Sequence, residues 1–514
     1  MPSIHPKIQL PLPVQGIRAD LDDFHLPPDA LRSTSYNWLL RDGKMVTRPG
    51  LTTFANDPGT ARPTAAIFFR DVNNTSHLVH ATDTNWWRYD SSTNTWDDIS
   101  DAGLLWSAGT LAAPATFRVF NSGGDTYLLG TSLGPNNTPR AWDTTPTSNV
   151  FTLFGGSAPA AHCIAIVGDR VILGALQTNR QAIDVSAFQD HTSGWGVTQT
   201  AVLAETPGPI VTMQELGINQ CAVYKTNSIY IVSATTGLAP LRFDLHTANI
   251  SGPMSVRAVV PISSSVHAVF TEESELFFFD GVNYSRHPAS PMIQSLFLLD
   301  ASTTITGTGS LHGHYNRRYN ELWWFYSRAG LESLGQTDAI VVNLNNNSVW
   351  KANFFDNAQI PITAAHYGQV FSSTTRRPVF YLANSSGQFY TMEGNQDVNT
   401  SINANLETGL SDLGDPTQAK TLEETEHYFA NPTATETPSV NILTSESGSA
   451  PTISPNRSLV LSASSTGPYR LGHRATGGGK ITSRFMGIRI RDTGLTSPLE
   501  YRGTSLTIVP RGNR

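Results

Sequence analysis

Charge and cysteine are both scarce in this chain of 514 residues. Charged residues make up 15 % of the sequence, below the roughly 25 % usual for soluble domains, so Ser, Thr, Asn and Gln must supply much of the polar surface. The two cysteines, Cys163 and Cys221, both stand in apolar contexts. Two cysteines are too few for a disulfide framework at this length, so we expect two buried thiols.

The sequence also lacks long hydrophobic runs and an excess of basic over acidic residues. No apolar stretch approaches the ~18 residues of a membrane span, and the start of the chain lacks the basic and apolar regions of a secretory signal. The net charge of −7 argues against tight binding of nucleic acid, which needs a basic protein surface. A channel with a mildly acidic wall would instead repel the phosphate backbone of nucleic acid, so that the nucleic acid could pass through it without binding.

Short aromatic strands separated by polar turns fill the middle of the sequence, and several of these repeats end in tryptophan, as at Trp96, Trp142 and Trp350. Few stretches keep a helical apolar period, so we expect an all-β fold. The repeats begin near residues 65, 115, 163, 210, 258, 309 and 362. A spacing of about 50 residues with about four strands per repeat predicts a β-propeller of about seven blades.

The flanking regions have a different pattern. We expect an N-terminal arm and hairpin over residues 1–60, the propeller over 61–395, and a β-sandwich-like domain over 396–514. Asp42-Gly43 predicts a two-residue hairpin turn, because both positions favour positive φ. Prolines keep the segment Ile8–Leu12 extended, which makes it a candidate for strand pairing between subunits.

Motifs that could carry chemistry are weak. His312-Gly313-His314 has a spacing used by metal sites but no third ligand nearby in the sequence. Glu272, Glu273 and Glu275 fall on a predicted turn, where a solvated hairpin tip is expected. Gly477-Gly478-Gly479-Lys480 lacks the full phosphate-loop spacing. We therefore predict no catalytic, cofactor-binding or metal-binding residues, no cofactor, and no enzymatic activity.

Two tryptophan pairs suggest an alternative function. Trp86-Trp87 and Trp323-Trp324 could stack sugars, although on strands one member of each pair should face the core. A carbohydrate-binding or carbohydrate-cleaving propeller, such as a receptor-binding tail protein, is therefore the alternative to a structural role. A cellular propeller that serves as an interaction platform is a further alternative.

Several segments, in a constant order over nearly the whole chain, carry a resemblance to a known family. They are Asn37 with Gly43 and Arg48-Pro49-Gly50; Ala182–Asp190 with Trp195; Ala222–Ile231 followed by Ile250–Val256; Phe277–Gly281; Thr476-Gly477 with Arg489; and Tyr501–Gly503 with Pro510–Arg514. Together they resemble the propeller-containing tail nozzle or hub proteins of tailed phages, the group that includes the phage stabilisation proteins of short-tailed phages.

The resemblance implies a structural protein of the virion tail, made in the host cytoplasm. Such proteins form a ring, usually a homohexamer, below the head-to-tail adaptor protein. The ring extends the channel for double-stranded DNA, without sequence-specific binding or membrane insertion, and carries tail fibres or a spike. We expect the same partners for this chain.

Overall fold

The computed structural model describes most of residues 6–510. The exceptions within that span are 24, 56–61, 101–113, 133–137, 145–151, 155–156, 237–238, 300–310, 329, 332, 357, 370, 372–376, 431–435, 448–450, 455–456, 459–460, 462–468, 473–480 and 497. The described part is nearly all β-structure, with one ten-residue α-helix, α1 (Ser290–Leu299). The predicted all-β class is confirmed.

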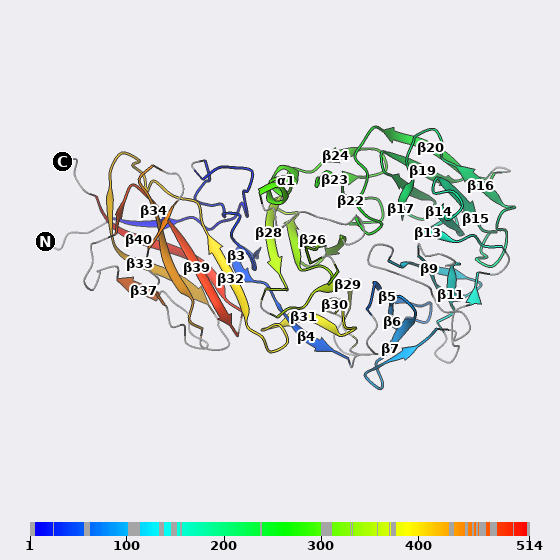
Figure 1. The fold of residues 1–514 in the computed structure, drawn as a ribbon, viewed down its shortest axis with the longest axis horizontal. Helices are drawn as coiled ribbons and strands as arrows, with labels where there is room; N and C mark the ends of the chain where they lie inside the picture. Colours follow the sequence, from blue (N-terminus) through cyan, green and yellow to red (C-terminus); the bar gives the residue numbers. More distant parts are fainter. Residues whose placement is uncertain are drawn as a thin grey trace.

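Seven four-stranded antiparallel sheets form the blades of a propeller on the right of Figure 1. Their strands, from the inside of each blade outward, are β5 (Ala65–Arg70), β6 (Ser76–Ala81), β7 (Trp86–Asp90), β8 (Thr95–Asp98); β9 (Thr116–Ser122), β10 (Asp125–Thr131), β11 (Arg140–Trp142), β12 (Thr152–Leu153); β13 (Ala161–Val167), β14 (Arg170–Leu176), β15 (Ala182–Val185), β16 (Gln199–Val202); β17 (Ile210–Glu215), β18 (Gln220–Lys225), β19 (Ser228–Ala234), β20 (Leu241–Ala248); β21 (Val259–Pro261), β22 (His267–Phe270), β23 (Leu276–Phe279), β24 (Tyr284–Arg286); β25 (His312–Asn316), β26 (Glu321–Tyr326), β27 (Asp338–Asn343), β28 (Ser348–Asn353); and β29 (Ile362–Gln369), β30 (Pro378–Asn384), β31 (Phe389–Gly394), β4 (Gly50–Phe54).

The first strands of the blades begin at residues 65, 116, 161, 210, 259, 312 and 362, close to the predicted starts. Each innermost strand contacts the innermost strand of the next blade, and β29 contacts β5, which closes the ring. A small sheet cannot bury both of its faces alone, so each blade depends on its neighbours for cover.

The outer strand of the last blade comes from the other end of the chain. β4 pairs with β31, with Thr53 opposite Tyr390, and so completes the blade begun by β29. The described part of residues 1–60, the expected arm and hairpin, is thus divided between the propeller and the C-terminal body. A β-carbon on Gly50 would lie 2.2 Å from the carbonyl oxygen of Gln396, so this close approach requires glycine.

The C-terminal body consists of two sheets, as the predicted sandwich requires. The seven-stranded sheet contains β1 (Lys7–Leu10), β2 (Trp38–Arg41), β3 (Lys44–Thr47), β33 (Lys420–Ala430), β37 (Tyr469–Gly472), β38 (Thr482–Ser483) and β40 (Glu500–Pro510). The five-stranded sheet contains β32 (Ile402–Glu407), β34 (Ser439–Ser445), β35 (Thr452–Ile453), β36 (Arg457–Ser458) and β39 (Phe485–Leu495). Buried side chains of both sheets, such as Ile508 and Ile488, belong to one hydrophobic cluster.

The N-terminal segments are built into this body. Asp42 and Gly43 both have positive φ, at 50° and 71°, which confirms the predicted hairpin between β2 and β3. β1 pairs with β40 of the same chain, so Ile8 lies opposite Leu506. The segment was expected to pair with a strand of another subunit. It pairs within the chain instead, because β40 has a free edge beside it. The first and last described strands, β1 and β40, thus lie side by side in the C-terminal body (Figure 1).

Candidate functional site

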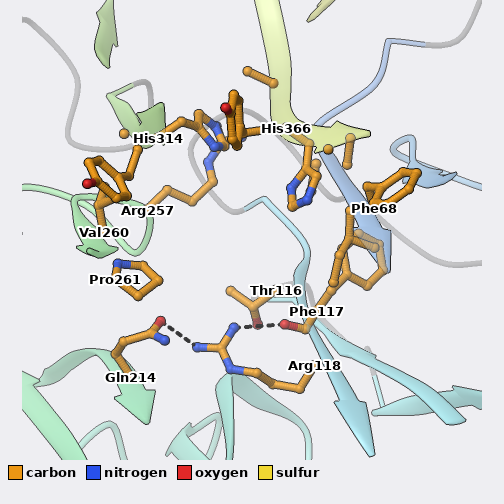
Figure 2. A pocket seen from close by; sticks show the side chains of 18 of the residues that line it. Phe68, Thr116, Phe117, Arg118, Gln214, Arg257, Val260, Pro261, His314 and His366 are labelled. Atoms are coloured by element: carbon orange, nitrogen blue, oxygen red, sulfur yellow. Dashed lines mark hydrogen bonds between the residues drawn. The ribbon is translucent and has the colours of Figure 1, made fainter. Parts of the chain in front are cut away.

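The innermost strands of all seven blades surround a central cavity of about 1260 Å³. Its walls include aromatic and aliphatic side chains such as Phe68, Phe117 and Val260 (Figure 2). Large, partly apolar pockets with a few converging polar groups are the usual places for ligands to bind. The cavity is therefore the candidate functional site of the described part of the chain.

Arginines dominate the charge of the cavity, although the protein as a whole is acidic. The charged residues that line it are Arg70, Arg118, Arg257, Arg317, Arg318, Arg377 and Glu215. The net charge of the chain thus does not describe this cavity. The reason is local, because most of these arginines lie on an innermost strand or directly beside one, whereas the net charge averages over the whole chain.

Arg118 is fully engaged within the protein. Its Nε donates to Glu215 Oε1 at 2.7 Å, and its other nitrogens donate to the carbonyl oxygens of Phe117 and Met213 and to Gln214 Oε1. The ion pair joins the second blade to the fourth across the third. Arg118 therefore has a structural role in the cavity wall.

Arg257 has a different environment. It precedes β21 in the fifth blade, and its Nη1 donates to the carbonyl oxygen of Thr64 in the first blade at 2.7 Å. Its Nε and Nη2 are buried and have no hydrogen-bond partner among the described residues. Burial, with no carboxylate to offset it, lowers the pKa of Arg257 to about 9.

Two histidines share the wall with Arg257. The rings of His314 and His366 lie 6.2 Å apart, and Figure 2 shows them across the cavity from Arg118. Burial is the main cause that lowers the pKa of His366 to about 4 and that of His314 well below its usual value. Both imidazoles are therefore neutral at pH 7, with one donor and one acceptor each.

His312 and Gly313 of the His312-Gly313-His314 motif act in packing. A β-carbon on Gly313 would lie 2.2 Å from the Trp324 ring and 2.5 Å from Val260 Cγ2, so the glycine allows adjacent blades to approach. His312 stacks on Phe325, with ring centroids 5.0 Å apart. In the described residues, no group of three or more His, Cys, Asp or Glu side chains is arranged to hold a metal.

Residues of the first resemblance segment converge at the junction between the two bodies. Arg48 is buried, and its guanidinium pairs with the Asp397 carboxylate through Nη1, at 2.9 Å, and Nη2. Its Nε donates to Asn37 Oδ1 at 3.0 Å, and its Nη2 donates to the carbonyl oxygen of Asn353 in β28 at 2.7 Å. Asn37 has a φ of 62° and also accepts from the Asn353 amide.

A second buried pair strengthens this junction. Arg41 of β2 donates through Nε and Nη2 to the two carboxylate oxygens of Glu321 in β26, both at 2.8 Å. The hydrophobic cluster of the C-terminal body also continues into the sixth blade through Trp323 and Trp350. We call Asn37, Arg41, Arg48, Glu321 and Asp397 the junction cluster.

The remaining sequence candidates have structural surroundings. Glu275 pairs with Arg286 on the β22–β24 hairpins, and Cys163 and Cys221 are free and buried, as expected. One member of the Trp323-Trp324 pair was expected to face the core; both are fully buried, because neighbouring blades cover both faces of their sheet. The Gly477–Lys480 segment lies outside the described residues, as do Thr476 and Arg511–Arg514.

The sequence did not identify Arg257 or Arg118 as members of a site. A lone arginine beside a strand has no distinctive spacing, and the cavity forms only when blades distant in sequence meet. The available signal was the recurrence of arginine in the innermost strands and directly after them, as at Arg70, Arg118 and Arg317.

No protein-family model matches the chain, and no curated protein matches it. Solved structures similar to it include the extracellular domain of the hybrid two component system BT4673 from B. thetaiotaomicron (10 % identity, TM-score 0.43, 67 % of this chain and 39 % of that one). This chain thus spans less than half of that protein. A second is Saccharomyces cerevisiae Sqt1 (10 % identity, TM-score 0.37, 70 % of this chain and 100 % of that one). A third is BBS1N in complex with ARL6DN (11 % identity, TM-score 0.40, 68 % of this chain and 99 % of that one). No helix among the described residues is long and apolar enough to cross a membrane.

Proposed function

We propose that this chain is a structural protein of a tailed-phage virion, a tail nozzle or hub that forms a ring, with six copies, below the head-to-tail adaptor. In this role it has no enzymatic activity. The ring extends the DNA channel and anchors fibres or a spike. The channel is the lumen between subunits, distinct from the central cavity of each propeller.

The junction cluster is the observation that carries this proposal. A hub has to transmit force between the adaptor and the distal tail, so its two bodies must not hinge. Here the propeller and the C-terminal body share hydrophobic core and two buried ion pairs. Domains joined only by small polar interfaces move relative to each other by default. The cluster also contains Asn37 and Arg48, two of the residues that carry the family resemblance.

Negative-stain electron microscopy and mass measurement of the purified full chain, alone and with the adaptor protein, test the proposal. We expect closed rings with a central hole and a mass of six subunits. The variant Arg48→Met should form fewer closed rings, while Lys44→Met, which removes a partly exposed pair with Glu500, should behave as the unmodified protein does.

A chain that stays monomeric at high concentration even with the adaptor present would contradict the proposal. Release of sugar from bacterial surface polysaccharide, or specific glycan binding by the monomer, would favour the alternative of a carbohydrate-active propeller.

A further inference from the structure

We propose that the central cavity of the propeller binds a small oxyanion ligand, a phosphate ester or a carboxylate with an apolar body, and that Arg257 and His314 hold its anionic group. This inference does not depend on the role of the protein in a virion.

Arg257 offers the edge of the guanidinium that is suited to an oxyanion. Its Nε and Nη2 are buried without a partner among the described residues, while Nη1 is bound to Thr64. Nε and Nη2 are also the atoms with which Arg41 holds both oxygens of Glu321 at 2.8 Å. This fork matches carboxylate and phosphate oxygens in a bidentate arrangement. In the part of the chain that the structure describes, Arg257 is thus a cation of the cavity wall whose buried Nε and Nη2 hold no partner, and this is the edge with which Arg41 binds a carboxylate.

The charge balance of the cavity favours an anion. A buried cation is stable only with a partner, and an arginine does not lose its proton to avoid the cost of burial. Among the described residues, Glu215 is the one carboxylate in the cavity lining, and it already pairs with Arg118. No carboxylate of the described residues pairs with Arg257. An oxyanion ligand would supply the missing countercharge.

The surroundings of Arg257 define the rest of the ligand. His314 lies beside it in the cavity wall (Figure 2) and can donate a further hydrogen bond from its neutral ring. Val260, Pro261 and Phe68 provide apolar surface within the same cavity. The exposed side chains of Arg317 and Arg318 add positive charge to the lining, which raises the local concentration of anions.

The size of the cavity favours a small molecule over a polynucleotide. Its volume of about 1260 Å³ is slightly larger than the ~300–1,000 Å³ of typical ligand pockets. Arg257 also crosses from the fifth blade to Thr64 in the first blade. This bond lies beside the starts of β5 and β21, so it obstructs the passage of a chain along the propeller axis.

Isothermal titration calorimetry of the full chain at fixed ionic strength tests the proposal, with phenyl phosphate and benzoate as probes. We expect at least one probe to bind, and Arg257→Gln to weaken that binding by about 10-fold or more, as the loss of a charge-assisted bidentate contact requires. Arg242→Gln is the control, because Arg242 is exposed on β20 and pairs with Asp244. It should bind as the unmodified protein does.

The two probes separate the possible sources of the oxyanion. Binding of phenyl phosphate alone identifies a phosphate ester, and binding of benzoate alone identifies a carboxylate. Binding of neither probe at millimolar concentration overturns the proposal, as does equal weakening by Arg257→Gln and Arg242→Gln. If circular dichroism shows that Arg257→Gln is unfolded, crystals of the unmodified protein soaked in selenate decide. Anomalous density beside Arg257 Nε supports the site, and its absence there refutes it.

Discussion

At the scale of single residues, the buried charges show that position in the fold matters more than residue type. Arg48 is buried and Arg118 and Arg257 lie in the cavity wall, but among the described residues only the first two have a carboxylate partner. An ion pair removed from water is costly to break, because the remaining charge keeps its desolvation penalty. Loss of one partner should therefore have large effects here.

Arg48→Met should destabilise the protein by about 3–5 kcal/mol, since it leaves the Asp397 carboxylate buried without its cation. Chemical denaturation measures the loss. Lys44→Met is the matched control; it removes a partly exposed pair with Glu500 and should cost under about 1 kcal/mol. Similar losses in both variants would show that the junction cluster contributes little.

Ionisation of Asp492 should lower the stability of the folded protein as the pH rises. Burial raises the pKa of Asp492 to about 6, and its Oδ2 has no partner among the described residues. Because the unfolded pKa is about 3.9, the native state binds more protons between these values, and stability falls as pH rises through them. Asp492→Asn should remove this loss and stabilise the protein at pH 7 by up to about 3 kcal/mol.

Melting temperatures of the Asp492→Asn variant and the unmodified protein, measured from pH 4 to pH 7, check this expectation. Asp83→Asn, at an exposed position, is the control and should leave the profile unchanged. A constant difference between Asp492→Asn and the unmodified protein across this range would contradict it.

At the scale of elements, the propeller depends on strands that come together from distant parts of the chain. The blades were predicted from sequence because each has its own aromatic strands and polar turns within about 50 residues. The closing strand β4 was not assigned to a blade, because its partner β31 is encoded far away. No local pattern in Gly50–Phe54 marks it as the outer strand of the last blade.

Gly50→Ala should weaken this closure. The new β-carbon would lie 2.2 Å from the backbone oxygen of Gln396, so the start of β4 must shift away from β31. We expect a loss of about 1–3 kcal/mol, as in other cases of overpacking, and faster proteolysis between β4 and β5. Gly494→Ala, whose β-carbon would approach Asp492 only to 3.8 Å, is the control. Equal melting temperatures of the two variants would exclude this constraint.

At the scale of the whole molecule, buried histidines distributed over the blades should make the protein sensitive to acid. Burial lowers the pKa of His80 to about 3 and those of His162, His267 and His366 to about 4. The unfolded chain protonates these groups below about pH 6.5, so it gains protons that the native state does not bind. Stability should therefore fall as pH falls from 6.5, by up to about 2 kcal/mol per histidine at pH 5.

His80→Phe isolates one such contribution, since His80 stacks on Trp96 and its ring nitrogens are buried without partners among the described residues. The variant should lose less stability than the unmodified protein between pH 7.5 and pH 5 in thermal melts. His25→Phe, which removes an exposed pair with Asp22, should change the pH profile far less than His80→Phe does. Parallel profiles for all three proteins would contradict the expectation.

Local pattern in the sequence determined the all-β class, the blade starts, the Asp42-Gly43 turn and the burial of both cysteines, because each depends on neighbouring residues and on turn chemistry. Tertiary structure alone decided that β4 closes the ring, that Arg48 and Arg41 join two bodies, and that Arg257 lies unpaired in a basic cavity. These features arise where segments hundreds of residues apart meet, and the burial and pairing of a charge depend on that meeting.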